Sequence, residues 1–129
     1  MRLGQVERWH AVYDREKVAT LVEAYKAGEA VPTVVCLHQG KNGLLVALSG
    51  VHRLAALDEV YGDACEIDEL PDGLISVYDA EILCEGEDED TVEAISRAFP
   101  PRGDVQDVIR AVLPFVDDTD AVALRTQLV

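Results

Sequence analysis

The sequence predicts an α+β domain, in which a small mixed sheet has flanking helices and a C-terminal helical extension. The chain has 129 residues, a normal length for one compact domain. Hydrophobic residues make up 49% of it, which is enough for a core. The predicted elements run strand, helix, strand, strand, helix, strand and then helices only. We expect a core over residues 1–84 and an acidic helical extension, residues 85–129, packed on the same domain.

The first predicted elements are a strand and a helix. Residues 5–13 alternate loosely between apolar and polar side chains, a pattern typical of a short strand. Asp14 is a suitable N-cap, and Gly28 is a suitable C-cap for the helix between them. The inward face of this helix is predicted from four apolar residues at helical spacing: Val18, Leu21, Val22 and Tyr25.

A β-hairpin and a second helix are expected next. Residues 34–37 and 44–48 are continuous apolar runs, and the turn between them, 38–43, ends in Asn-Gly. Neither run alternates, so both faces of these strands are expected to be covered. The pair Ser49-Gly50 then breaks the strand, and a helix is predicted over residues 51–61.

The rest of the chain predicts one more strand and several helices. A loop over 63–73 precedes a strand over 74–83, and the acidic run 85–90 is expected to be solvated. The capping-box pattern at Asp90 starts a helix that reaches about Phe99. Asp104 is expected to cap a further helix that ends or kinks at Pro114, before a last short helix over 118–128.

The charges are unevenly distributed along the chain. Residues 1–57 contain seven Lys or Arg and five Asp or Glu, whereas residues 58–129 contain four and twenty. Acidic surfaces repel nucleic acid and acidic lipid, so direct DNA binding and membrane binding are not expected. The acidity also fits a simpler role in solubility. A cytoplasmic location is expected, because no apolar leader or span is present and the three separated cysteines suit reduced thiols.

The segment between the hairpin and the second helix has the residue types of an anion site. The first N–H groups of a helix lack internal partners and attract phosphate. A glycine permits close approach, a hydroxyl can donate, and imidazole and guanidinium groups add charge-assisted donors. These features come from five consecutive residues: Ser49, Gly50, Val51, His52 and Arg53. The alternative is an ordinary strand-to-helix connection with exposed polar residues.

The first helix offers a second set of donors. Lys17 and Thr20 lie one turn apart on a stripe beside its predicted inward face. If this helix lies next to the 49–53 segment, the ammonium and the hydroxyl can reach the same anion. An ordinary solvated helix face is the alternative.

Both segments resemble one known superfamily. Residues 48–57 resemble the Gly-x-His-Arg helix start of the ParB/sulfiredoxin superfamily, and residues 13–21 resemble the Asp-x-x-Lys-Val-x-Ser-Leu helix of sulfiredoxins. The resemblance covers residues 6–62. It implies a ParB/sulfiredoxin-like fold in which Lys17 and Thr20 contact a nucleotide, while His52 and Arg53 hold its phosphates.

The resemblance is incomplete in ways that affect function. Val51 stands where sulfiredoxins have their catalytic Cys, so sulfiredoxin chemistry is excluded. ParB proteins have a Glu-Arg-Arg version of the turn and an additional DNA-binding domain, for which this chain is too short. Kinases of free serine in the superfamily use a nearby acid as base, and Glu7 is the counterpart suggested by its position near the first strand.

Two functions remain open from the sequence. The first is a nucleotide-binding domain for a nucleoside di- or triphosphate such as ATP, ADP or CTP with Mg²⁺, with possible phosphoryl transfer or NTP hydrolysis. The second is a non-catalytic module of a phage- or plasmid-encoded accessory protein, whose acidic extension binds a protein partner or mimics nucleic acid. A protein-held metal site is not predicted, because Cys36 and His38 lack a third ligand at zinc spacing.

Overall fold

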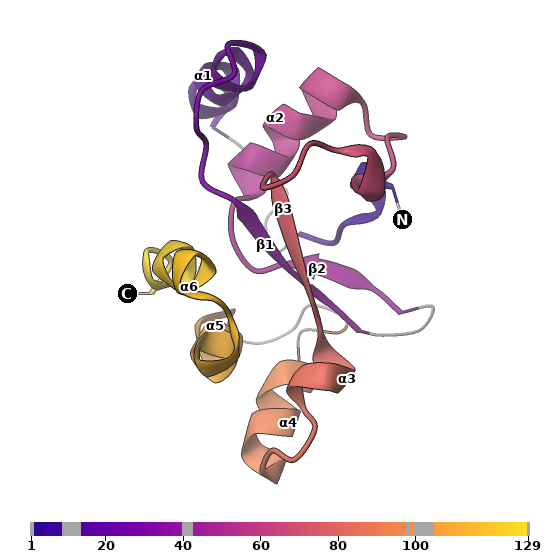
Figure 1. Cartoon of the computed structure of the whole chain (residues 1–129), viewed down its shortest axis with the longest axis vertical. Helices are drawn as coiled ribbons and strands as arrows, with labels where there is room; N and C mark the ends of the chain where they lie inside the picture. Colours follow the sequence, from indigo (N-terminus) through magenta and orange to yellow (C-terminus); the bar gives the residue numbers. More distant parts are fainter. Residues whose placement is uncertain (1, 9–13, 40–42, 98, 100–104, 129) are drawn as a thin grey trace.

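The protein is an α+β structure with a three-stranded mixed sheet and a C-terminal helical region, as the sequence predicts. The computed structural model describes residues 2–8, 14–39, 43–97, 99 and 105–128. Within these residues there are six α-helices, and the strand order is β2-β1-β3. Figure 1 shows α1 and α2 at one end of the sheet and α3 and α4 at the other.

The predicted hairpin is confirmed. Strand β1 (Val34–His38) pairs antiparallel with β2 (Leu45–Ala47), and Cys36 lies opposite Ala47. Both strands are buried almost throughout, which confirms that both faces of these apolar runs are covered. The turn includes residues 40–42, which lie outside the described residues. Strand β3 (Ile75–Asp79) pairs parallel with β1 on its other side and forms an edge of the sheet.

The strand predicted over residues 5–13 is wrong for the part that the structure describes. Leu3–Gln5 forms a 3-10 turn, η1, whose Leu3 N–H donates to Cys65 O at 2.8 Å. Glu7 forms only an isolated bridge to Val46. Residues 9–13 lie outside the described residues. Loose alternation identified an extended chain here, but the contacts that decide its pairing come from residues far away in sequence.

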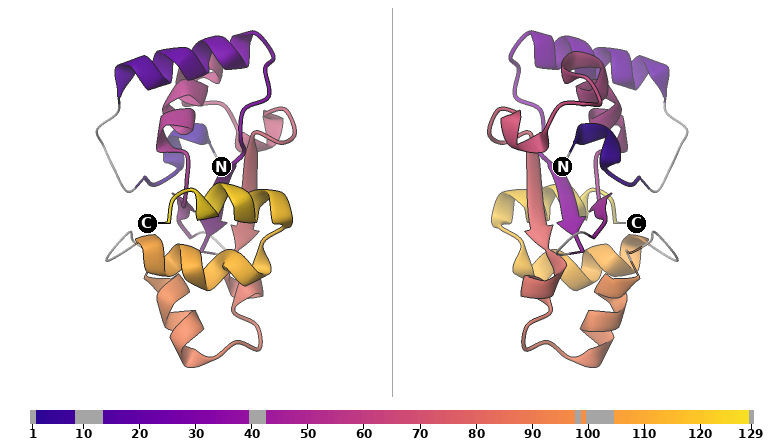
Figure 2. Two further views of the ribbon diagram at one scale, coloured as in Figure 1. Left: turned by 90° about the vertical axis from the view of Figure 1, so that its left-hand side faces the viewer. Right: turned by 90° about the vertical axis from the view of Figure 1, so that its right-hand side faces the viewer.

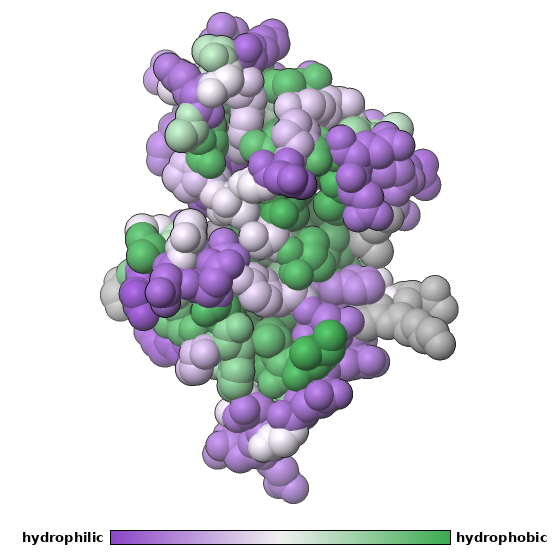
Figure 3. All heavy atoms as spheres, viewed as in Figure 1, coloured by the Kyte–Doolittle hydropathy of each residue, from purple (hydrophilic) through white to green (hydrophobic). Residues whose placement is uncertain are grey.

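The predicted end of β3 is also wrong. The chain leaves the sheet at Asp79, whose carboxylate oxygen Oδ1 accepts hydrogen bonds from Glu81 N (2.8 Å) and Ile82 N (3.4 Å). This N-cap starts the short helix α3 (Ala80–Leu83), which the apolar run had concealed. Val77 of β3 is 48% exposed and Ile82 of α3 is 66% exposed. The face of the molecule in Figure 3 has apolar atoms between two polar ends.

Helices α1 (Arg15–Lys26) and α2 (Val51–Tyr61) form where the sequence predicts them. Asp14 Oδ1 accepts from Glu16 N at 3.0 Å and Lys17 N at 3.4 Å, which confirms the N-cap. Gly28 follows the end of α1 with a φ of 72°. The two helices pack side by side through Val18 and Val22 of α1 and Ala56 of α2.

The described part of the C-terminal region contains three helices that are longer than α3. Helix α4 (Glu89–Ser96) begins after Asp88, whose Oδ1 accepts from Thr91 N at 2.8 Å, so the predicted cap at Asp90 is wrong by two positions. Helix α5 (Val105–Val112) ends before the 3-10 turn η3 (Leu113–Phe115), which confirms Pro114 as a break. Its predicted cap, Asp104, lies outside the described residues. Helix α6 (Asp118–Arg125) is capped by Asp117.

The sheet separates two apolar layers. One side of β1, through Val34 and Cys36, packs with Leu54 and Leu57 of α2. The other side, through Val35 and Leu37, packs with the C-terminal helices, and Figure 2 shows α5 and α6 lying across that face. The buried residues that α4, α5 and α6 contribute to this layer are Ile95, Val108, Ile109, Val112 and Leu124. No described helix has the length and apolar character needed to cross a bilayer.

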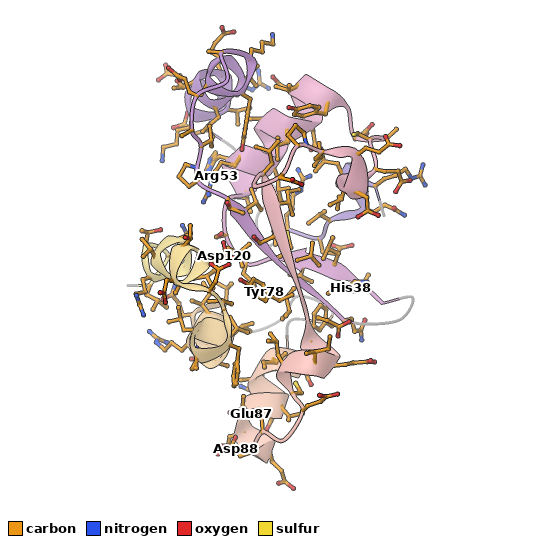
Figure 4. All side chains as sticks on the ribbon, viewed as in Figure 1. His38, Arg53, Tyr78, Glu87, Asp88 and Asp120 are labelled. Carbon is orange, nitrogen blue, oxygen red and sulfur yellow. The ribbon has the colours of Figure 1, made fainter. Side chains whose placement is uncertain are left out.

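A buried hydrogen bond joins α6 to the sheet. The Tyr78 hydroxyl of β3 donates to Asp120 Oδ2 at 2.5 Å and accepts from Asp117 N at 3.2 Å (Figure 4). Asp120 is only 2% exposed. Burial and then the bond to Asp120 raise the pKa of the Tyr78 hydroxyl to about 12.

Replacing Tyr78 with phenylalanine is expected to lower the free energy of unfolding by about 1–3 kcal/mol, because the Asp120 carboxylate loses its donor. Because the folded-state pKa is raised above the ordinary 10.0, the hydroxyl's stabilisation is complete below pH 10 and is lost as the pH rises to about 12. Urea denaturation across this pH range checks both points. The difference between wild type and Tyr78→Phe should shrink with rising pH, and a constant difference would contradict this assignment.

Candidate functional site

A cavity of about 490 Å³ lies in front of the first turn of α2. All five residues of the predicted segment line it: Ser49, Gly50, Val51, His52 and Arg53. Leu21 of α1 and Pro32 lie along its rim, and α5 and the residues after α6 form the remaining wall. Its volume falls within the range of about 300–1,000 Å³ that is typical of small-molecule sites.

The backbone leaves the sheet and enters α2 within three residues. Leu48 N–H donates to Val35 O at 2.8 Å, and Ser49 is 3% exposed with its Oγ accepting from Val35 N at 3.4 Å. Gly50 is the N-cap with φ 74° and ψ 37°, a left-handed conformation that disfavours other residues. Because glycine has no side chain to accept from the first turn, no side-chain cap covers the N–H groups of residues 51–53.

Two backbone carbonyls hold one side of the Arg53 guanidinium. Its Nη1 donates to Pro32 O at 2.7 Å and to Thr33 O at 2.8 Å. The other side lies over Gly50, since a Cβ on that glycine would be 2.9 Å from Arg53 Nε and 3.1 Å from Nη2. Burial lowers the pKa of Arg53, an effect that the nearby Tyr25 opposes, but an arginine remains charged at neutral pH.

The Nε–Nη2 edge of Arg53 is therefore the part that can bind a ligand. Among the described residues, no hydrogen-bond acceptor contacts Nε or Nη2, whereas Nη1 has two. Arg53 also lines the cavity, and Figure 4 shows its side chain between α2 and the chain that leads into β1. Two parallel N–H groups on one guanidinium edge match the spacing of two oxygens on a phosphate or carboxylate.

His52 connects the two helices. Its Nε2 accepts a hydrogen bond from Asp14 N at 3.1 Å. The bond fixes the start of α1 beside the start of α2, although the two residues are far apart in the sequence. His52 therefore positions α1 as well as lining the cavity.

A second hollow, of about 550 Å³, adjoins the cavity and contains the predicted residues of α1. Lys17 and Thr20 line it together with His52, and Leu21 and His52 line both spaces. The Thr20 hydroxyl donates its proton to Glu16 O at 2.9 Å, which leaves the two lone pairs of its oxygen for incoming donors. The structure thus brings Lys17 and Thr20 next to the 49–53 segment.

Glu7 does not join this group. Its side chain is exposed, and it lines neither the cavity nor the second hollow. Its backbone instead bonds to β2, with Glu7 N donating to Leu45 O at 2.7 Å and Ala47 N donating to Glu7 O at 2.9 Å. The structure therefore provides no geometric support for Glu7 as a base at this site.

The residues around the cavity do not fit a Mg²⁺ ion beside a bound phosphate. Such ions are held by one or two carboxylates together with phosphate oxygens. Neither Asp nor Glu is among the described residues that line the cavity. The second hollow contains Asp14 and Glu16, but Asp14 Oδ1 already accepts from two backbone N–H groups. At Cys36, burial raises the thiol pKa to about 12, which disfavours the thiolate that metals bind.

Two parts of the site could not be identified from the sequence. The Pro32 and Thr33 carbonyls that fix Arg53 are backbone groups, which no side-chain pattern reveals. The wall opposite Arg53 contains Gln106 and Gln127, and the Gln106 side-chain amide donates to the backbone oxygen of Gln127. Only a fold that places α5 and α6 across the sheet brings these residues to the cavity.

The fold and the site define a small α+β protein with a cavity at the start of α2, lined by Arg53 and the first turn of that helix. Comparison of the chain with protein-family models, curated proteins and solved structures finds no match.

Proposed function

We propose that this protein is a nucleotide-binding domain that holds its ligand's phosphate at the start of α2. The observation that carries this proposal is the Arg53 guanidinium. Its Nη1 is fixed by the Pro32 and Thr33 carbonyls, and its Nε–Nη2 edge is left for an oxyanion at the cavity. The uncapped N–H groups of residues 51–53 lie in the same lining, so both sets of donors can serve one phosphate.

The adjoining second hollow supports a ligand larger than phosphate. Lys17 contributes a further cation to its lining, and Ile109 and Gln106 line the first cavity. A phosphate at α2 with an apolar and amide-lined space beyond it suits a ligand that combines an anion with a sugar and base. The ParB/sulfiredoxin-like residues in the sequence are consistent with the same class of ligand.

The proposal concerns binding, and turnover is a separate question. Of the carboxylates in the two spaces, Asp14 serves as the cap of α1, and Glu16 lines the second hollow only. Neither lies in the cavity that would hold the phosphate. Phosphoryl transfer or hydrolysis would need a base, and the described carboxylates do not supply one in the cavity.

Titration with nucleotides is expected to raise the melting temperature, because a ligand that binds only the folded state stabilises it. Calorimetric titration and thermal unfolding with adenine, cytosine, guanine and uracil nucleotides test this. Chromatography of the same mixtures detects any product. Stabilisation with saturable heat is the expected result. The absence of both for every nucleotide, at concentrations well above a millimolar, would contradict the proposed function.

A further inference from the structure

We infer, on the basis of the proposed function, that the cavity takes a nucleotide with a single phosphate group and holds it without Mg²⁺. The sequence suggests a nucleoside di- or triphosphate with Mg²⁺, and this inference replaces that ligand with a nucleoside monophosphate. Three properties of the described residues lead to it: the balance of charge around the two spaces, the number of phosphate donors, and the neutrality of the opposite wall.

The positive charges on the described lining residues are too few for a polyphosphate. Arg53 is the only Lys or Arg among the described residues of the first cavity, and Lys17 is the only one in the second hollow. Asp14 and Glu16 in that hollow match these two cations with two anions. A phosphate monoester carries about −1.5 to −2 charges at neutral pH, and each further phosphate adds negative charge that no described lining residue compensates.

The available donors also suit one phosphate. Sites that surround several phosphates often use a longer glycine-rich loop, whose successive N–H groups point at the ligand. Here residues 48–50 are the whole connection between β2 and α2, and the Leu48 N–H is already bonded to Val35 O. Among the described residues of the first cavity, the donors left for phosphate oxygens are chiefly one guanidinium edge and one uncapped helix start, and together they can surround a single tetrahedral group.

The described residues of the opposite wall of the cavity are uncharged. The described residues that α5 and the chain after α6 contribute are Val105, Gln106, Ile109 and Gln127. Although residues 58–129 contain twenty Asp or Glu, none of them is among the described residues that line this cavity. Aliphatic and amide groups suit the sugar and base of a nucleotide better than a second phosphate. The net charge of −14 also opposes the approach of a more highly charged anion.

Calorimetric titration of the whole chain with the mono-, di- and triphosphates of each base tests the inference, with every series measured in excess Mg²⁺ and again in EDTA. For the base that binds best, the monophosphate is expected to bind at least about tenfold more tightly than the triphosphate. Its affinity should not change when EDTA replaces Mg²⁺. The inference is overturned if the triphosphate binds more tightly than the monophosphate, or if monophosphate binding requires Mg²⁺.

The outcomes separate this inference from the proposed function. Triphosphate binding that depends on Mg²⁺ and is lost in Arg53→Ala would reject the single-phosphate inference and keep the proposed function. No binding of any nucleotide would reject both. Arg97→Ala is the matched control, because Arg97 is an exposed arginine at the C-terminal cap of α4 that pairs with Glu93 and lines neither space. It should retain the wild-type order of affinities.

Discussion

Arg53→Ala is expected to weaken nucleotide binding by about 10- to 100-fold. The guanidinium supplies the charge-assisted donors of the site, and such bonds contribute about 1.5–3 kcal/mol, where about 1.4 kcal/mol corresponds to a factor of ten. The arginine cannot be replaced by a general positive charge, because its Nη1 is held by Pro32 O and Thr33 O while the proposed function assigns its Nε–Nη2 edge to the phosphate. Calorimetric titration of the variant with the best-binding nucleotide measures the effect.

Two further variants make this result specific. Arg53→Lys keeps a positive charge but cannot bond to both carbonyls and present a two-nitrogen edge, so it should lose most of the affinity. Arg97→Ala, at the exposed C-terminal cap of α4, should bind as the wild type does. Circular dichroism at the temperature of the titration shows whether Arg53→Ala is folded, because it also loses two bonds to the backbone. Equal affinities for wild type and folded Arg53→Ala would contradict the role given to this residue.

Leu124→Ala is expected to lower the free energy of unfolding by about 2–5 kcal/mol, the range for removing a large side chain from a core. Leu124 is fully buried and belongs to the apolar layer between the sheet and the C-terminal helices, with Val35, Leu37 and Ile109. Because Ile109 also lines the cavity, a loosened α6 should weaken ligand binding as well. Urea denaturation and nucleotide titration of the variant measure the two effects.

Helix α6 supplies a matched control for this core variant. Val122 is 60% exposed on the same helix, so Val122→Ala should change the free energy of unfolding by no more than about 0.5 kcal/mol. A large loss for Leu124→Ala with a small one for Val122→Ala is the expected pattern. Similar values for the two variants would show that the apolar layer seen between α6 and the sheet does not stabilise the protein.

Much of the fold could be predicted because its signals are local. Asp14, Gly28 and Gly62 mark the helix ends of α1 and α2 by capping chemistry that depends on a few neighbouring residues. The hairpin of β1 and β2 follows from two apolar runs around a turn. Errors arose where two local patterns compete, as at Asp79, where an apolar run continues past a residue that caps a helix.

The site was only partly accessible from the sequence for a related reason. The 49–53 segment is contiguous, and its chemistry can be recognised without a structure. Whether Lys17 lies near it depends on the packing of α1 against α2 and on the bond between Asp14 and His52. The carbonyls that orient Arg53 and the glutamines of the opposite wall are brought in by long-range folding alone. Glu7 was chosen by its position in the sequence, and the structure places it elsewhere.

Amide resonances of the isotope-labelled protein test most directly whether a phosphate binds at the start of α2. Spectra with a saturating nucleoside monophosphate should be compared with spectra with the same nucleoside lacking its phosphate. The account predicts that the phosphate-dependent changes are largest at the backbone N–H groups of Val51, His52 and Arg53. Phosphate-dependent changes centred on other residues, with these three amides unaltered, would contradict it.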